Sequence, residues 1–251
     1  MAEPGGAEIP VDLGWRMDSD EAALAFFPPE PLDAGQAEAL ASLDPLGSAE
    51  GLARRVLQIR CPYNLRVRVT PRGVKPVTFF RVDEPGSLSE GAFQGLFQFL
   101  EPSAQRRADL PVVQVSLNVV MVTEEPCALM LTPPFLAEGY RDWPGPIVSG
   151  RFPIRSWPRV LNAVMEWEDR DRDWVLRRGE PMAYLWVGFD DPRKVPRLVE
   201  AATTPALETH YRRVSGVIEY GRNVAPMFAE AERRRPPRLL VPKRTGTPAW
   251  D

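Results

Sequence analysis

Residues 146–187 constrain the fold more strongly than any other part of the chain, because hydrophobic alternation and turn residues agree along the whole segment. Every second side chain in 160–167 is apolar: Leu161, Ala163, Met165 and Trp167. A period of two is typical of a strand with one buried face. The charged run 169–173 is expected to be a hairpin loop, and Gly179 with Pro181 marks a second turn. The segment therefore predicts an antiparallel meander at the centre of a β-rich domain.

Proline is frequent, at 28 of 251 residues, which is about twice its ordinary share of ~5%. Because proline is excluded from helix interiors and central strands, we expect short strands and many loops. The 44% of hydrophobic residues are sufficient for a core, and no segment approaches the ~20 apolar residues of a membrane span. These features predict a mainly β (α+β) fold: an antiparallel β-sandwich, or a jelly-roll or β-clip-like domain, with a C-terminal helix.

Other strands are predicted from the same alternation. Apolar residues in 65–69 alternate with arginines, and 77–82 is expected to return as the second strand of a hairpin. Uninterrupted alternation makes 112–122 the clearest strand in the chain. We expect 128–131 to be its partner.

Helices are predicted where capping residues precede helix-forming segments. Asp33 is the expected N-cap of a helix over 34–43, and a Ser-x-x-Glu spacing predicts another helix over 92–100. Thr204-Pro205 places an N-cap before a proline at the first helical position, and 206–220 has apolar residues at helical spacing. This last helix is expected to close the fold.

Charge divides the chain into three parts. Residues 1–50 contain eleven acids and only Arg16 as a base, a net charge of −10, while the whole chain carries −3. We expect this segment to be partly disordered with one short helix, and either to contact the basic remainder or to be solvated. Residues 56–225 are the predicted β-rich core domain. Residues 226–251 form a basic, proline-rich tail that we expect to be mobile beyond Arg235.

Two runs of sequence carry a recognisable pattern. PIVSGRFPIRSWPRVLNAVMEW contains Gly-x-Phe-x-Ile-x-x-Trp-x-Arg, and VLRRGEPMAYLWV contains an Arg-Gly-Glu-Pro turn. Both resemble a family of uncharacterised bacterial and tailed-phage proteins with the same run and a later Lys/Arg-Gly-Asp/Glu-Pro turn. Cys61-Pro62 and Thr132-Pro133-Pro134-Phe135 stand in the order that this family shows, so the resemblance covers residues 59–189. It implies a shared fold and no established activity.

A weaker similarity is to the trimeric dUTPase and dCTP deaminase group, whose late strands follow a comparable order. At Gly150-Arg151-Phe152 this chain lacks the Asp-x-x-Tyr of that group, and it has no glycine-rich phosphate-binding tail. The similarity therefore implies at most a shared strand order.

Residues suited to metal binding or nucleophilic catalysis are scarce. His210 is the only histidine and is expected on the surface of a helix, while Cys61 and Cys127 are expected to be separate buried thiols. These three residues do not furnish the ligands of a transition-metal site, so we expect no such metal. Neither a Walker loop nor GxGxxG is present, so no cofactor is expected. Few cysteines and the lack of a basic and apolar leader in MAEPGGAEIP favour a cytoplasmic protein.

An anion-binding site is the most specific chemical hypothesis. Arginine prefers bidentate contacts to phosphate and carboxylate, and in a strand over 148–154 Arg151 faces away from the inward Phe152 and Ile154. The candidate ligand-binding residues are Arg151, Arg155, Trp157, Arg159, Asn162 and Glu166. The alternative is a solvated arginine face, with the tryptophans in the core.

Two classes of function remain open. The first is a non-catalytic binding or assembly module of unknown specificity, with another protein or a second copy of the chain as partner. The second is an enzyme that acts on a small anionic ligand with Arg, Asn and carboxylates, for which Glu124-Glu125 or Glu166 with Glu168 could be acid and base or Mg²⁺ ligands. The basic tail lacks interleaved aromatic residues, so neither nucleic acid nor a membrane is an expected partner.

Overall fold

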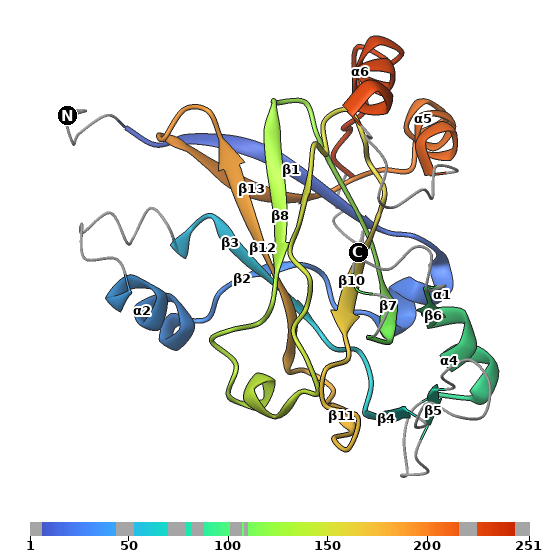
Figure 1. Cartoon of the computed structure of the whole chain (residues 1–251). Helices are drawn as coiled ribbons and strands as arrows, with labels where there is room; N and C mark the ends of the chain where they lie inside the picture. Colours follow the sequence, from blue (N-terminus) through green and yellow to red (C-terminus); the bar gives the residue numbers. More distant parts are fainter. Residues whose placement is uncertain are drawn as a thin grey trace, which may run out of the picture.

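The strands form three sheets in a sandwich, with helices packed at its ends and sides (Figure 1). The computed structural model describes residues 7–43, 53–69, 79–81, 88–100, 107, 110–215 and 225–243. Its helices are α1 (Asp20–Ala25), α2 (Ala34–Ser42), α4 (Glu90–Leu96), α5 (Pro205–Ser215) and α6 (Ala225–Arg233), with a 3-10 helix at Glu138–Asp142. The predicted mainly β sandwich with a C-terminal helix is confirmed. No helix in these ranges is long and apolar enough to cross a membrane.

The first sheet has the order β10-β7-β1-β13, and β6 also pairs with β7. β1 and β13 are parallel, while the other pairs are antiparallel. Its strands are β1 (Ile9–Met17), β6 (Phe97–Phe99), β7 (Val112–Thr123), β10 (Val160–Glu166) and β13 (Lys194–Glu200). β7 pairs first with β6 and then with β1, and Asn118 lies between the two regions with a φ of 50°. Asparagine adopts this left-handed conformation more readily than most residues.

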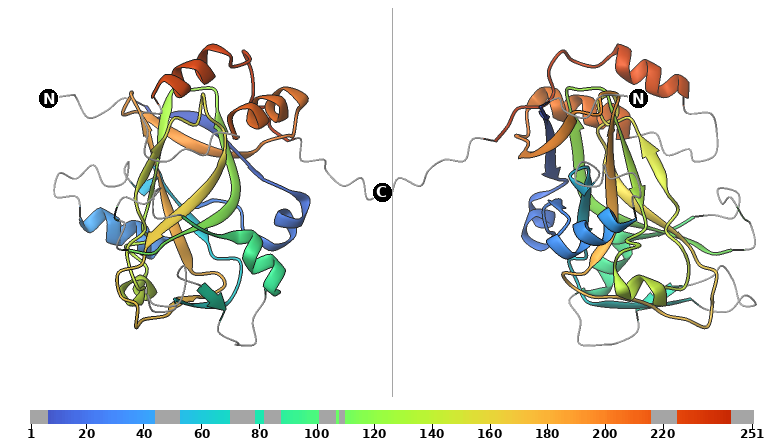
Figure 2. Two further views of the ribbon diagram at one scale, coloured as in Figure 1. Left: turned by 45° about the vertical axis from the view of Figure 1, so that its right-hand side comes forward. Right: turned by 90° about the vertical axis from the view of Figure 1, so that its left-hand side faces the viewer.

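The second sheet has the order β2-β3-β12-β8-β9, and the third has the order β11-β4-β5. All of their pairs are antiparallel. Their strands are β2 (Glu30–Pro31), β3 (Val56–Arg60), β4 (Leu65–Val69), β5 (Phe79–Arg81), β8 (Cys127–Thr132), β9 (Gly150–Phe152), β11 (Trp174–Leu176) and β12 (Pro181–Phe189). The third sheet lies at the opposite end of the molecule from α5 and α6, which sit side by side (Figures 1 and 2).

One main core packs the inner faces of the first two sheets and continues onto the third. Leu161, Ala163 and Met165 of β10 are each at most 1% exposed, so the predicted alternation of this strand is confirmed. Trp167 and Trp174 are also buried in this core, as expected for most of the tryptophans. A second cluster covers the outer face of the first sheet and includes Val122, Leu207, Leu239 and Leu240.

Local capping and turn predictions agree with the structure. Asp33 forms a capping box with Gln36 at the start of α2. Gly179 has a φ of +87° in the turn before β12, a conformation that glycine adopts without strain. The predicted helix range 92–100 was wrong, because α4 starts after its N-cap Ser89 and gives way to β6 after Leu96.

The predicted meander over 146–187 is wrong, although its strands are present. β9 pairs with β8, β10 with β7, β11 with β4, and β12 lies between β3 and β8. The loop 169–173 therefore joins two different sheets and is not a hairpin, and β8 is not the partner of β7. Alternation shows which face of a strand is buried, but it does not determine the neighbouring strand.

The predicted N-terminal and C-terminal limits of the folded part of the chain are also wrong. Ile9 and Pro10 belong to the segment 1–50 that was expected to be partly disordered, yet they begin β1, which lies between β7 and β13. The chain after Arg235, expected to be mobile, packs on the first sheet through residue 243, with hydrogen bonds from Ala202 N to Val241 O (2.8 Å) and from Lys243 N to Glu200 O (2.7 Å). The folded unit therefore includes segments on both sides of 56–225. The expected helix end at 216–220 and strand residues 77, 78 and 82 lie outside the described residues.

Candidate functional site

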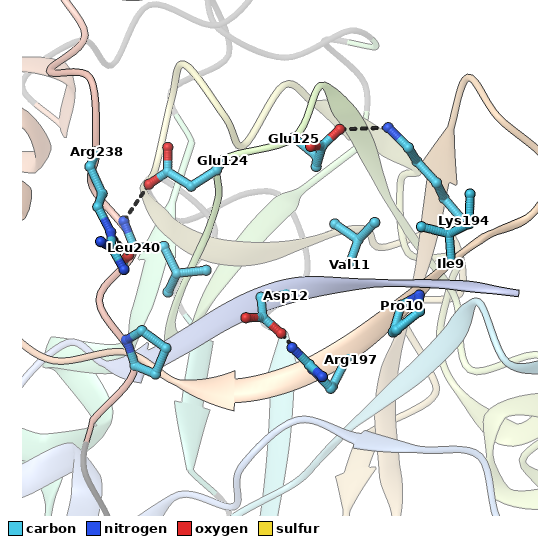
Figure 3. Close-up of a pocket in the computed structure, with 11 residues that line it drawn as sticks. Ile9, Pro10, Val11, Asp12, Glu124, Glu125, Lys194, Arg197, Arg238 and Leu240 are labelled. Atoms are coloured by element: carbon cyan, nitrogen blue, oxygen red, sulfur yellow. Dashed lines mark hydrogen bonds and ion pairs between the residues drawn. The ribbon is translucent and has the colours of Figure 1, made fainter.

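A pocket of about 450 Å³ lies over the first half of β1 (Figure 3). Its walls come from β1, the start of β13, the turn between β7 and β8, and the C-terminal segment 238–242. Ile9, Val11 and Leu240 supply apolar surface. The charged residues that line it are Asp12, Glu124, Glu125, Lys194, Arg197 and Arg238.

The C-terminal segment can pack against β1 because β1 has a glycine, Gly14, where Leu240 lies on the strand. A Cβ atom at Gly14 would collide with the Cδ1 atom of Leu240 and would lie 2.9 Å from Cγ1 of Val122. Without that atom, Leu240 lies directly on β1 and buries its side chain to 4% exposure. Gly14 therefore allows the tail to form one wall of the pocket.

Glu124 anchors the same segment through its carboxylate. One oxygen accepts hydrogen bonds from the backbone N–H groups of Leu239 (2.7 Å) and Leu240 (2.6 Å). The other pairs with Arg235, whose side chain is only 4% exposed and also donates to Thr123 O (3.2 Å). Burial by itself raises the pKa of Glu124, but the hydrogen bonds from Leu240, Arg235 and Leu239 outweigh it and hold the pKa below its ordinary value.

The other carboxylates of the pocket are also paired. Asp12 accepts from Arg197 at 2.6 Å, and Glu125 accepts from Lys194 at 2.6 Å, as Figure 3 shows. Arg238 differs, because its Nε donates to the carbonyl of Leu240 (3.3 Å) and no carboxylate of the described chain pairs with it. Among the described residues, Arg238 is therefore the one cation of this pocket without a carboxylate partner.

Glu124→Gln is expected to lower the free energy of unfolding by roughly 1.5–3 kcal/mol at neutral pH, the range for losing a charged hydrogen bond. Because folding lowers the pKa of Glu124, its contribution is complete above the ordinary pKa of 4.5 and is lost as the pH falls through the folded value. Urea unfolding at several pH values should show the difference between the two proteins shrinking below pH 4.5.

Glu125→Gln is the matched control, since Glu125 belongs to an exposed pair with Lys194. Such a pair contributes about 0–1 kcal/mol. Equal losses of stability in the two variants would contradict the anchoring role of Glu124.

The structure separates the first three residues of the predicted anion site. Arg151 is exposed on β9, at the edge of the second sheet. The strand ends at Phe152, so Arg155 lies outside it. Arg155 pairs with Glu232 of α6 and donates to Glu124 O at 2.9 Å. Trp157 is buried against Phe228, with ring centroids 5.0 Å apart.

Of the other three residues, Arg159 immediately precedes β10, and Asn162 and Glu166 belong to it. The Arg159 guanidinium lies 6.0 Å from the centre of the Phe152 ring. Asn162 is half-buried opposite Ser116 of β7, and Glu166 is buried at the end of the strand. Of the six candidates, only Trp157 lines one of the pockets that the structure describes.

His210 and the two cysteines have surroundings that disfavour reactivity. The prediction of a surface histidine is wrong, since His210 is 2% exposed and its Nε2 donates to Ser156 O at 2.9 Å. Cys61 is buried as predicted, whereas Cys127 is half-buried, and burial raises the pKa of each thiol to about 12. Within the described ranges, no three His, Cys, Asp or Glu residues are grouped to hold a metal ion.

The pocket over β1 was not predicted from the sequence. Glu124 and Glu125 were singled out as candidate acid and base or Mg²⁺ ligands, but Glu124 binds backbone N–H groups and Arg235. Asp12 and Arg238 belong to segments for which no structure was expected. The pairing of Asp12 with Arg197, distant in the chain, has no local signal in the sequence.

Comparison with protein-family models, curated proteins and solved structures finds no match to this chain. The resemblance to bacterial and tailed-phage proteins therefore stays a prediction.

Proposed function

We propose that the protein is a non-catalytic binding module whose pocket over β1 takes an extended, acidic segment of a partner protein. The observation that carries this proposal is the combination of Arg238, which lacks a carboxylate partner in the described chain, with apolar surface beside it. Ile9 is 37% exposed at the other end of the pocket. A segment that alternates acidic and apolar residues matches both features.

The carboxylates of the pocket are engaged in hydrogen bonds and ion pairs, and this favours binding over catalysis. A general base works best with a pKa near the operating pH, whereas Glu124 has a lowered pKa. Five hydrogen bonds or ion pairs hold the acids of the pocket. An enzyme acting on a small anionic ligand, the alternative, calls for a cleft that collects Arg151, Arg155, Asn162 and Glu166. These residues do not share a described pocket.

A fluorescein-labelled peptide of alternating Glu and Leu is a direct probe, with a Gln and Leu peptide of equal length as its neutral counterpart. Fluorescence anisotropy is expected to show tighter binding of the acidic peptide, weakening with added salt because the exposed charges are screened. Arg238→Gln should weaken it by about 10-fold to 100-fold, the equivalent of one charged hydrogen bond.

Arg233→Gln is the control variant, because Arg233 is exposed on α6 and does not line this pocket. It should leave the affinity for the acidic peptide unchanged. Equal binding of the two peptides, or equal effects of the two variants, would show that the pocket does not recognise acidic segments.

A further inference from the structure

The helix α2 covers only part of the outer face of the second sheet. Leu40 of this helix is buried and packs in one cluster with Val56 of β3 and Tyr184 of β12. The helix therefore forms a ridge on this face, beside β2 and β3 (Figure 1). Its exposed side consists of small residues and one acid: Ala34, Gly35, Glu38, Ala39 and Ser42.

An apolar strip lies on the same face beyond the helix. Trp186 of β12 packs at the border of the cluster under α2, and Met130 of β8 is its direct cross-strand partner, so both side chains point to this face. Met130 is 38% exposed, and the Phe135 ring, 40% exposed, stacks on Trp186 with ring centroids 6.3 Å apart. Gly188 and Ala128 are the next pair on this face and add little bulk. Adjacent exposed apolar side chains of this kind indicate an interaction surface.

The strip and the ridge carry opposite charges. Arg151 of β9 is the cross-strand partner of Met130 and is exposed at the end of the strip, while Glu38 is exposed on α2. Neither Arg151 nor Glu38 has an ion pair among the described residues. Glu30 and Arg60, on β2 and β3 of the same sheet, pair with each other. The strip therefore ends in a cation, and the ridge presents an anion.

We propose that this face is the interface of a symmetric homodimer, in which α2 of each copy lies on the apolar strip of the other. A two-fold interface joins the same patch of both copies, so the patch has to be complementary to itself. A ridge of small side chains beside an open apolar strip meets this requirement in shape, and Glu38 with Arg151 meets it in charge. The surface is separate from the pocket over β1 and does not depend on the function proposed for that pocket.

Sedimentation velocity on the full chain is expected to show a reversible monomer–dimer equilibrium with a dissociation constant in the micromolar range. Met130→Asp should weaken the dimer at least about 10-fold, because it buries a charge in the apolar strip when the two copies associate. Leu24→Asp is the matched control, since Leu24 is 89% exposed on α1, away from α2 (Figure 1). It should leave the dissociation constant unchanged.

Charge exchange tests the arrangement of the two copies. Arg151→Glu and Glu38→Arg should each weaken the dimer about 10-fold or more, because each places like charges opposite one another. The variant with both changes should recover most of the lost affinity, since the pair is then reversed but still complementary. The proposal is overturned if the full chain is a monomer at about 1 mM, if Met130→Asp and Leu24→Asp have equal effects, or if the double variant is no better than the single ones. Both charged residues are exposed, so these variants should fold.

Discussion

Truncation after Pro237 is expected to leave most of the protein insoluble. The deletion removes Leu239 and Leu240, which are 0% and 4% exposed, from the cluster on the outer face of the first sheet. Loss of one buried leucine side chain costs about 2–5 kcal/mol, and the whole chain is expected to be stable by only about 5–15 kcal/mol. The deletion also leaves Glu124 without its two backbone donors. Soluble yield and thermal unfolding measure the effect.

Truncation after Lys243 is the control, because it keeps every described contact of the C-terminal segment. Its melting temperature should be close to that of the full chain. Leu239→Ala in the full chain should lower stability by about 2–5 kcal/mol, whereas Val241→Ala, at a residue 37% exposed, should have a smaller effect. Similar melting temperatures for the two truncations would contradict the structural role of the segment.

Gly145→Ala is expected to destabilise the protein by about 3 kcal/mol or more, at the upper end of the range for overpacking. A Cβ atom at this position would overlap the carbonyl oxygen of Glu166 and lie 3.1 Å from Glu168 N. These are backbone atoms, so no side chain can rotate away. The flanking segment is held by hydrogen bonds from Glu168 N to Pro144 O (3.0 Å) and from Glu166 N to Pro146 O (3.2 Å). Urea unfolding with a linear extrapolation measures the loss.

Gly95→Ala makes the same chemical change at an open position. Apart from the chain neighbours and the backbone of α4 itself, no atom of the described residues lies within 4 Å of a Cβ at Gly95, which is inside α4. Alanine in a helix is favoured over glycine by about 0.5–1 kcal/mol, so this variant should be slightly more stable than the original chain. If the two glycine variants lose stability alike, the close approach at Gly145 is not the cause.

Features that depend on nearby residues were predictable from the sequence. The alternation of 161–165 identified the buried face of β10, because successive side chains of a strand point to opposite sides. Asp33 was identified as an N-cap because its hydrogen bond reaches only to Gln36. The turn at Gly179 followed from the conformational freedom of glycine. In each case the determining contacts span a few residues.

The candidate site could not be predicted in the same way, because its contacts join residues that are far apart in the chain. Asp12 and Arg197 are 185 positions apart, and Arg235 and Glu124 are 111 apart. The sequence showed Arg155 as a basic residue near a strand, but its pairing with Glu232 depends on where α6 packs.

The sequence alone therefore determined the mainly β class, the buried faces of individual strands, and the local caps and turns, because periodicity and short-range hydrogen bonds encode them. Only the tertiary structure decided the strand neighbours, the inclusion of both terminal segments, and the position of His210. The physical reason is that an alternating strand can pair with any strand offering a complementary buried face. The choice among partners depends on how the whole chain packs its core.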